Sequence, residues 1–144
     1  MDVSVVIPLY NAADILEESI KTVVDVLDSL EIDYEILLRD DGSCDGIAPI
    51  LKRVSSQYSN VQYSLSFQNK GLGATLRWLF HEAGGEKIIY CDCDLPFGTS
   101  VIPALLKSLD YDDIVVASRY GRRINRVRPV RRIVSRLYYY FCKV

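Results

Sequence analysis

Two patterns of apolar residues alternate along this chain: short continuous runs, and stretches in which apolar residues recur every three or four positions. Residues 3–8 form a continuous apolar run, VSVVIP, which is typical of a strand buried on both faces of a parallel sheet. The next apolar positions are three and four residues apart and predict an amphipathic helix, for which Asn11 would be the N-cap. These positions are Leu16, Ile20, Val23, Leu27 and Leu30. A strand followed by such a helix is half of a crossover unit.

The alternation continues to residue 118. It predicts strands at 34–39, 61–67, 87–91 and 113–118, and helices at 46–57, 71–84 and 99–109. This order predicts an α/β fold that is doubly wound around a mainly parallel, Rossmann-like sheet. No repeat or linker precedes residue 120. We therefore expect one domain over residues 1–120 and a basic, aromatic helical segment over 121–144.

Charge is distributed unevenly along the 144 residues. Residues 117–144 contain nine Lys and Arg and no acid, so residues 1–116 carry a net charge of −11. A basic segment of this kind is either a solvated helix or a surface for an anion. The acidic remainder would repel nucleic acid, and the aromatic run at 138–141 suits a membrane interface. We therefore expect contact with an anionic membrane surface and no nucleic acid.

The first residues and the cysteines bear on the compartment. MDVSVVIPLYN lacks a basic leader and a cleavage-type site, which predicts a cytoplasmic protein, peripheral to the membrane. Cys91 and Cys93 have no second Cys or His pair at ligand spacing, so zinc binding is disfavoured. The aromatic residues at 138–141 lack a closing turn, from which we expect that the chain continues into an acceptor or membrane-proximal segment.

Polar segments follow the predicted strands at their carboxyl ends, the edge where open parallel sheets bind ligands. The first segment, PLYNA, has no glycine, which argues against a nicotinamide-binding Rossmann domain. Asp40 and Asp41 end the second strand, where carboxylates can bind a base or a ribose, and Ser43 or Asp45 would cap the following helix. Lys70 and two glycines precede a helix N-terminus, an arrangement that favours a phosphate.

Asp92 and Asp94 stand one residue apart at the end of an apolar strand. On extended backbone they would point the same way, with the cysteines on the other side. Such a pair needs a compensating cation, and hard oxygen ligands beside a phosphate suit Mg²⁺ or Mn²⁺. The alternative is a solvated turn in which Thr99 or Ser100 caps the next helix. We favour the metal, because the turn gives the second carboxylate no role.

Five segments in the order VVIPLYN, LRDDGS, NKGLGAT, CDCDLP and ASRY resemble the family-2 glycosyltransferases of the GT-A fold. Among these the chain looks most like the polyprenyl-phosphate sugar transferases of the dolichyl-phosphate mannosyltransferase type. The resemblance implies a GDP- or UDP-sugar donor, transfer with inversion, and a polyprenyl phosphate acceptor. It also implies a divalent metal at Asp92 and Asp94.

The resemblance implies a role for individual residues by motif position. Asp92, Asp94 and Arg119 would be catalytic, and Arg119 would meet the diphosphate. Arg131 and Ser135 match an R-x-x-x-S segment that handles a donor or acceptor phosphate in the lipid-phosphate enzymes. The full substrate-binding set would be Pro8, Leu9, Tyr10, Asn11, Asp40, Asp41, Lys70, Gly71, Arg131 and Ser135. After CDCDL the chain reads PFG, so a third metal ligand that the family often places in this loop is absent.

Other functions compete with this interpretation. The acceptor would be a saccharide in other family-2 glycosyltransferases. A sugar nucleotidyltransferase usually has a glycine-rich segment directly after its first strand, which PLYNA lacks. A non-catalytic nucleotide-binding or membrane-binding module is the remaining alternative. A lipid phosphate is already an anion near neutral pH and needs no general base, and no extra Glu or His stands near the motifs.

Overall fold

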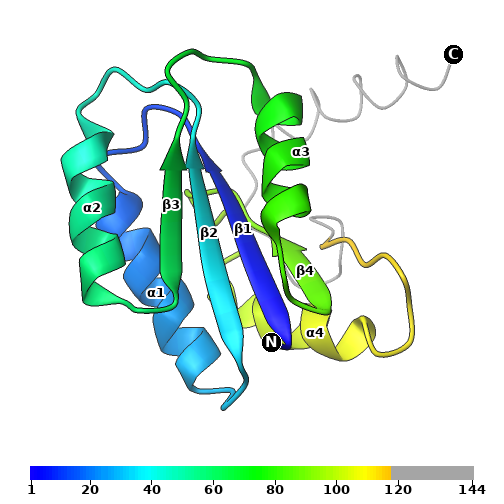
Figure 1. Ribbon diagram of the computed structural model, residues 1–144. Helices are drawn as coiled ribbons and strands as arrows, with labels where there is room; N and C mark the ends of the chain where they lie inside the picture. The colour runs from blue at the N-terminus through cyan, green and yellow to red at the C-terminus, as the bar shows by residue number, and fades with distance from the viewer. Residues whose placement is uncertain (118–144) are drawn as a thin grey trace, which may run out of the picture.

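The computed structural model describes residues 1–117, in which a four-stranded sheet carries helices on both faces (Figure 1). The elements are β1 (Val3–Leu9), α1 (Leu16–Asp28), β2 (Tyr34–Asp40), α2 (Ile47–Gln57), β3 (Val61–Leu65), α3 (Leu72–Glu82), β4 (Lys87–Tyr90), the 3-10 helix η1 (Thr99–Val101) and α4 (Ile102–Ser108). The strands and helices predicted up to residue 109 are confirmed, with differences of a few residues at their ends.

All four strands are parallel and lie in the order β3-β2-β1-β4. The chain builds outward from β1 through β2 to β3 and then returns to add β4 on the other side of β1. Open α/β sheets form a ligand crevice at such a reversal, beyond the carboxyl ends of the strands. The predicted doubly wound α/β fold is confirmed, and the reversal falls between the loops that follow β1 and β4.

The strands read as continuous apolar runs because helices cover both faces of the sheet. On one face, Ile7 of β1 joins a core with Leu16 of α1 and Leu51 of α2. On the other face, Val6 packs in a smaller core with Leu79 of α3. Neighbouring residues of β1 thus belong to two different cores, one on each face of the sheet. The helix that covers the second face is α3 (Figure 1).

The predicted helix caps are wrong. α1 begins at Leu16, and no side chain caps it. Asn11 instead has a left-handed backbone, with φ of 51°, and bonds to the loop after β2. α2 also lacks a side-chain cap, and Asp45 accepts a hydrogen bond from the Ala13 N–H at 2.7 Å. The loops of neighbouring strands converge here, so these side chains satisfy a neighbouring loop rather than their own helix.

The strand predicted at 113–118 is wrong over residues 113–117, which are irregular. Ile114 and Val116 are 83% and 80% exposed. Apolar β-branched residues favour a strand only where another strand and a core cover them. Within residues 1–117 no strand pairs with this segment.

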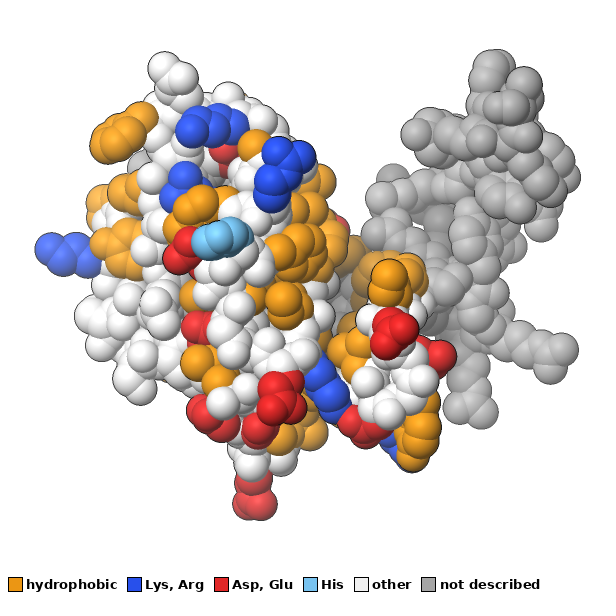
Figure 2. All heavy atoms as spheres, turned by 45° about the vertical axis from the view of Figure 1, so that its right-hand side comes forward, with side chains coloured by type: hydrophobic (Ala, Val, Ile, Leu, Met, Phe, Trp, Pro, Cys, Tyr) orange, Lys and Arg blue, Asp and Glu red, His pale blue; other side chains and the backbone are white. Residues whose placement is uncertain are grey.

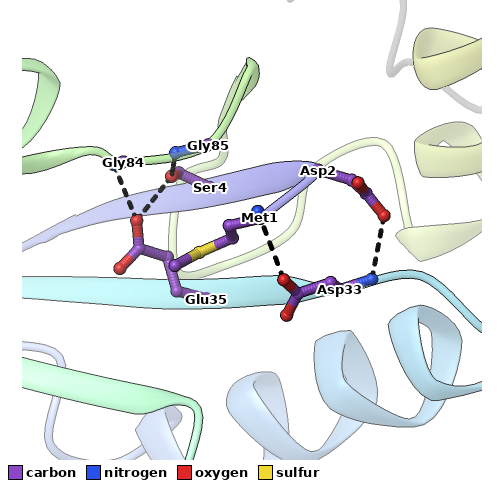
Figure 3. Close-up of polar contacts among 7 residues, drawn as sticks. All are labelled: Met1, Asp2, Ser4, Asp33, Glu35, Gly84 and Gly85. Carbon is purple, nitrogen blue, oxygen red and sulfur yellow. Dashed lines mark hydrogen bonds and ion pairs between the residues drawn. The ribbon is translucent and has the colours of Figure 1, made fainter.

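A buried polar cluster lies at the amino edge of the sheet (Figure 3). The Ser4 hydroxyl donates to a Glu35 carboxylate oxygen at 2.6 Å, and the Gly84 N–H donates to the same oxygen at 2.8 Å. The Gly85 N–H donates to the Ser4 hydroxyl oxygen at 2.8 Å. The cluster therefore sets where the chain leaves α3 and enters β4.

Several sequence predictions concern residues beyond 117. Arg119, Arg131, Ser135, the basic helical segment at 121–144 and the boundary at residue 120 lie outside the described residues and stay predictions. Over residues 1–117, none of the helices has both the length and the apolarity to cross a bilayer.

Candidate functional site

A groove of about 470 Å³ lies at the strand-order reversal, between the loops after β1 and β4. The end of β1 contributes Pro8, the loop after it contributes Tyr10, Asn11, Ala12, Asp14 and Ile15, and the loop after β4 contributes Asp92, Cys93 and Asp94. The structure thus brings together the predicted site residues of both loops, except Leu9. The side chain of Leu9 is 2% exposed and belongs to the core.

The side chains of residues 92–94 alternate between solvent and core. Asp92 and Asp94 are exposed, whereas Cys93 is 7% exposed and packs in the core. Both acids line the groove, but β4 ends at Tyr90 and residues 93–94 form a turn, so they do not stand on the extended backbone from which their common orientation was predicted. Neither η1 nor α4 has a side-chain cap, so the alternative in which Thr99 or Ser100 caps a helix is not formed.

Burial controls the protonation of the neighbouring groups. It raises the pKa of the Tyr90 hydroxyl, and the hydrogen bond that this hydroxyl donates to Asp92 raises the pKa further. Tyr90 therefore remains a donor that holds one Asp92 oxygen. Burial also raises the pKa of the Cys91 and Cys93 thiols to about 11, so both are neutral near pH 7.

The donor atoms of the groove fit Mg²⁺ or Mn²⁺. These ions bind one or two carboxylates and take their other ligands from water and phosphate oxygens. Asp92 and Asp94 supply such a pair. Asp14 lines the same groove, but among residues 1–117 no three His, Cys, Asp or Glu side chains are grouped so that they could hold a metal ion. A metal here would take its remaining ligands from a substrate and water.

Asn11 connects the groove to the loop after β2. Its N–H donates to the Ser43 hydroxyl oxygen at 2.8 Å, and its side-chain oxygen accepts from the Cys44 N–H at 3.0 Å. The Ser43 hydroxyl in turn donates to Asp40, which is buried. This chain of hydrogen bonds places Asp40 beside the groove, although Asp40 does not line it.

Asp41 clamps the loop after β3. Its two carboxylate oxygens accept hydrogen bonds from the Lys70 N–H at 2.9 Å and the Gly71 N–H at 2.8 Å. Asp41 is buried, so these backbone donors compensate its carboxylate. The three predicted residues therefore meet each other, none of them lines the groove between β1 and β4, and their binding to a substrate stays a prediction.

Sequence reasoning missed several contributors to this edge. Ala12, Asp14 and Ile15 line the groove, and Ser43 links it to Asp40. A signal existed for Asp14, because it precedes the helical stripe that starts at Leu16 and so belongs to the loop. Ser43 was predicted as a helix cap, but its hydroxyl instead donates to Asp40 of the same segment and accepts the N–H of Asn11 from another loop.

Solved structures share this fold. A mannosyltransferase from Pyrobaculum calidifontis, determined in complex with GDP-Man and Mn²⁺, covers 78% of this chain and 33% of its own, with a TM-score of 0.65 and 22% identity. The S. aureus protein TarS covers 88% of this chain and 39% of its own, with a TM-score of 0.55 and 22% identity. These likenesses establish the GT-A fold.

Curated relatives are more similar in sequence. A dolichol-phosphate mannosyltransferase from Pyrococcus furiosus is 33% identical over 139 residues, which are 94% of this chain and 39% of the relative. An undecaprenyl-phosphate 4-deoxy-4-formamido-L-arabinose transferase from Edwardsiella ictaluri is 37% identical over 123 residues, which are 84% of this chain and 38% of the relative. The chain thus spans about two fifths of the length of these relatives. Because the profile of glycosyl transferase family 2 also matches residues 4–143, the chain belongs to that family.

Proposed function

We propose that this chain contributes the donor site of a metal-dependent, inverting glycosyltransferase that moves a sugar from a nucleotide diphosphate to a polyprenyl phosphate. The observation that carries the proposal is the groove that Asp92 and Asp94 line together with Tyr10 and Asn11. Two relatives named for transfer to polyprenyl phosphates support the reaction class, and the Pyrobaculum structure contains GDP-Man and Mn²⁺.

The two loops suggest how a donor would lie. The nucleoside would lie along Pro8–Asn11, with Asp40 behind it, and the diphosphate would lie toward Asp92 and Asp94. These two carboxylates would hold a divalent ion, which would neutralise the charge that develops on the departing diphosphate. Tyr90 would keep Asp92 oriented through its hydrogen bond. Arg119, assigned by motif, would act on the same diphosphate.

A lipid phosphate acceptor has no proton that the groove would have to remove. An alcohol acceptor requires a general base, whereas a phosphate monoester is already ionised near neutral pH. The one His of the chain, His81, is exposed on α3 and does not line the groove. A lipid phosphate fits this arrangement without an additional catalytic residue.

Calorimetry with GDP- and UDP-sugars tests the donor site. Mn²⁺ is expected to strengthen binding to the natural protein, and Asp94→Asn is expected to remove at least tenfold of that gain. Asp112→Asn is the matched control, since Asp112 is exposed and does not line the groove. Donor binding that ignores Mn²⁺, or an equal loss in both variants, would contradict the assignment.

A paired acceptor assay tests the second half of the reaction. The same preparation is offered a short-chain polyprenyl phosphate and the corresponding polyprenol, with a labelled donor. Label is expected in the phosphate-linked product alone. Equal transfer to the alcohol, or preferential transfer to a free saccharide, would overturn the lipid-phosphate acceptor.

A further inference from the structure

A second groove of about 470 Å³ lies beside α3 and shares no lining residue with the donor groove. Its lining includes Arg39 from β2, Lys70 from the loop after β3, and Arg77 and Trp78 from α3. The guanidinium carbon of Arg39 lies 4.3 Å from the centre of the Trp78 ring. This stacking holds a cation at the surface of a sheet face that α3 covers only in part (Figure 1).

Positive charge gathers here against the trend of the described residues. Residues 1–117 contain eight Lys and Arg against nineteen Asp and Glu. Three of the eight basic residues form ion pairs with acids, namely Lys21, Arg53 and Lys87. Three of the remaining five line this groove, and within residues 1–117 none of those three has an ion pair. Figure 2 shows basic side chains gathered in the upper part of this face and acidic ones mainly below.

Two acids also line the groove, against its three Lys and Arg, and leave a small positive excess. Both oxygens of Asp41 accept backbone N–H groups, as described above. Glu82 lies 3.4 Å from the ring nitrogen of His81, at the far end of α3 from Lys70. The exposed charges next to the loop after β3 are therefore those of Lys70 and Arg77, since both oxygens of the buried Asp41 are occupied by backbone donors.

Exposed apolar side chains flank these cations. Phe67 is fully exposed, at 103%, and Leu72 is 54% exposed. The loop between them is held in place, because the Ser66 hydroxyl donates to the Gln68 carbonyl at 2.7 Å and Asp41 holds Lys70 and Gly71. A fixed backbone thus presents Phe67 to solvent, where burial against an apolar partner would be favourable.

We propose that the loop Ser66–Leu72 and the adjoining groove dock on an anionic phospholipid bilayer. Phe67 and Leu72 would enter the interface, while Lys70 and Arg77 would meet the head groups, the arrangement that binds peripheral proteins to acidic membranes. The proposal rests on the proposed function and deepens it. The loop leaves the same edge of the sheet as the donor groove, so docking would bring the donor to a lipid-linked acceptor.

Trp78 makes the contact measurable. It is the only Trp of the chain, and it lines the groove. The experiment adds vesicles of phosphatidylcholine, with or without phosphatidylglycerol, and contains neither donor nor polyprenyl phosphate. Phosphatidylglycerol vesicles are expected to shift the Trp78 emission, and brominated lipids in them are expected to quench it. Phosphatidylcholine vesicles are expected to do neither.

Matched substitutions assign the surface. Arg77→Glu and Phe67→Ser are each expected to weaken vesicle binding about tenfold, as loss of a basic or apolar interfacial contact does. Lys52→Glu makes the same charge change on α2, which covers the opposite face, and Tyr111→Ser removes another exposed aromatic side chain. Both controls are expected to bind within twofold of the natural protein. Circular dichroism verifies that each variant folds.

Three results would overturn the proposal. Equal losses in Arg77→Glu and Lys52→Glu would show that net charge alone acts. Vesicle binding without quenching of Trp78 would assign the contact to residues outside this groove. The same emission shift with inorganic phosphate or with an acidic polypeptide would replace the bilayer with another anion. Donor calorimetry without vesicles tests the proposed function separately. Donor binding can therefore be measured if membrane docking fails, and membrane docking can be measured if donor binding fails.

Discussion

The side-chain oxygen of Asn11 accepts a hydrogen bond from the N–H of Cys44, thirty-three positions further along the chain, at 3.0 Å. The Asn11 N–H adds a second bond, to Ser43. These bonds join the loops after β1 and β2 beside the donor groove. They also require a left-handed backbone at residue 11, which Asn adopts more readily than most side chains.

The link at residue 11 should be measurable in the stability of the protein. Asn11→Ala is expected to lower the free energy of unfolding by about 1–3 kcal/mol, because it removes the bond to Cys44 and because Ala tolerates a left-handed backbone less well than Asn does. Asn11→Gly removes the same bond without the backbone strain, so its loss should be smaller. Urea denaturation of the two variants compares these losses. A greater loss in the glycine variant would contradict the backbone argument.

Weakening the hydrogen bonds of the buried Asp41 should lower the free energy of unfolding more than weakening those of an exposed carboxylate. Asp41→Asn replaces one acceptor oxygen with an NH₂ donor that would face the N–H of Lys70 or Gly71, which is expected to lower the free energy of unfolding by about 1–3 kcal/mol. Asp45→Asn is the control, because Asp45 is exposed and accepts a single N–H, from Ala13. Its loss should stay below about 1 kcal/mol. Denaturant titration checks both values, and equal losses would argue against the clamp.

Gly85 and Gly73 should respond in opposite directions to alanine. A β-carbon at Gly85 would lie 2.5 Å from the Ser4 N, a contact that backbone atoms can relieve only by moving. Gly85→Ala is therefore expected to destabilise by several kcal/mol, about 2 or more. Gly73 lies in α3, and a β-carbon added there would meet no atom within 4 Å, so Gly73→Ala should stabilise by up to about 1 kcal/mol. Thermal melting of both variants provides the comparison.

We expect the protein to lose stability at high pH, because the pKa of Tyr34 is raised in the folded state. Burial, together with its 2.6 Å hydrogen bond to Asp28, raises the pKa of Tyr34 to about 12 in the folded protein. The unfolded chain loses this proton near pH 10. The stabilisation is therefore complete below pH 10 and falls as the pH rises from 10 to 12, by less than about 3 kcal/mol. Tyr34→Phe should show a shallower decline over this range, as measured by denaturation at each pH.

Much of the architecture could be predicted because each feature depends on short stretches of chain. The apolar run ending at Pro8 has to be buried on both sides, and the spacing from Leu16 to Leu27 permits only one helical face. The place of Asp92 and Asp94 at the ligand-binding edge follows from their position directly after a buried strand. Their meeting with Tyr10 follows from the rule that loops converge at the carboxyl edge of a parallel sheet.

The features that sequence reasoning missed depend on partners from elsewhere in the chain. Asn11 was predicted to cap the following helix, but its side-chain oxygen instead accepts a hydrogen bond from the Cys44 N–H of the neighbouring loop. Asp41 looked like a ligand contact, whereas the loop after β3 supplies two N–H groups to it. The apolar residues Ile114 and Val116 satisfied a strand pattern without a strand to pair with in the described residues. A local sequence pattern does not show which distant segment will supply a residue's hydrogen-bond or strand partner.

The clamp at Asp41 has a consequence for protein engineering. Because the acid at the end of one strand holds the backbone of a loop twenty-nine residues away, the two segments form a single cassette. A chimera that exchanges only the loop would keep the buried Asp41 carboxylate but could lose the loop conformation that points two backbone N–H groups at it. Grafting experiments between homologues should therefore move both pieces together, with the serine-containing turn that starts at Gly42.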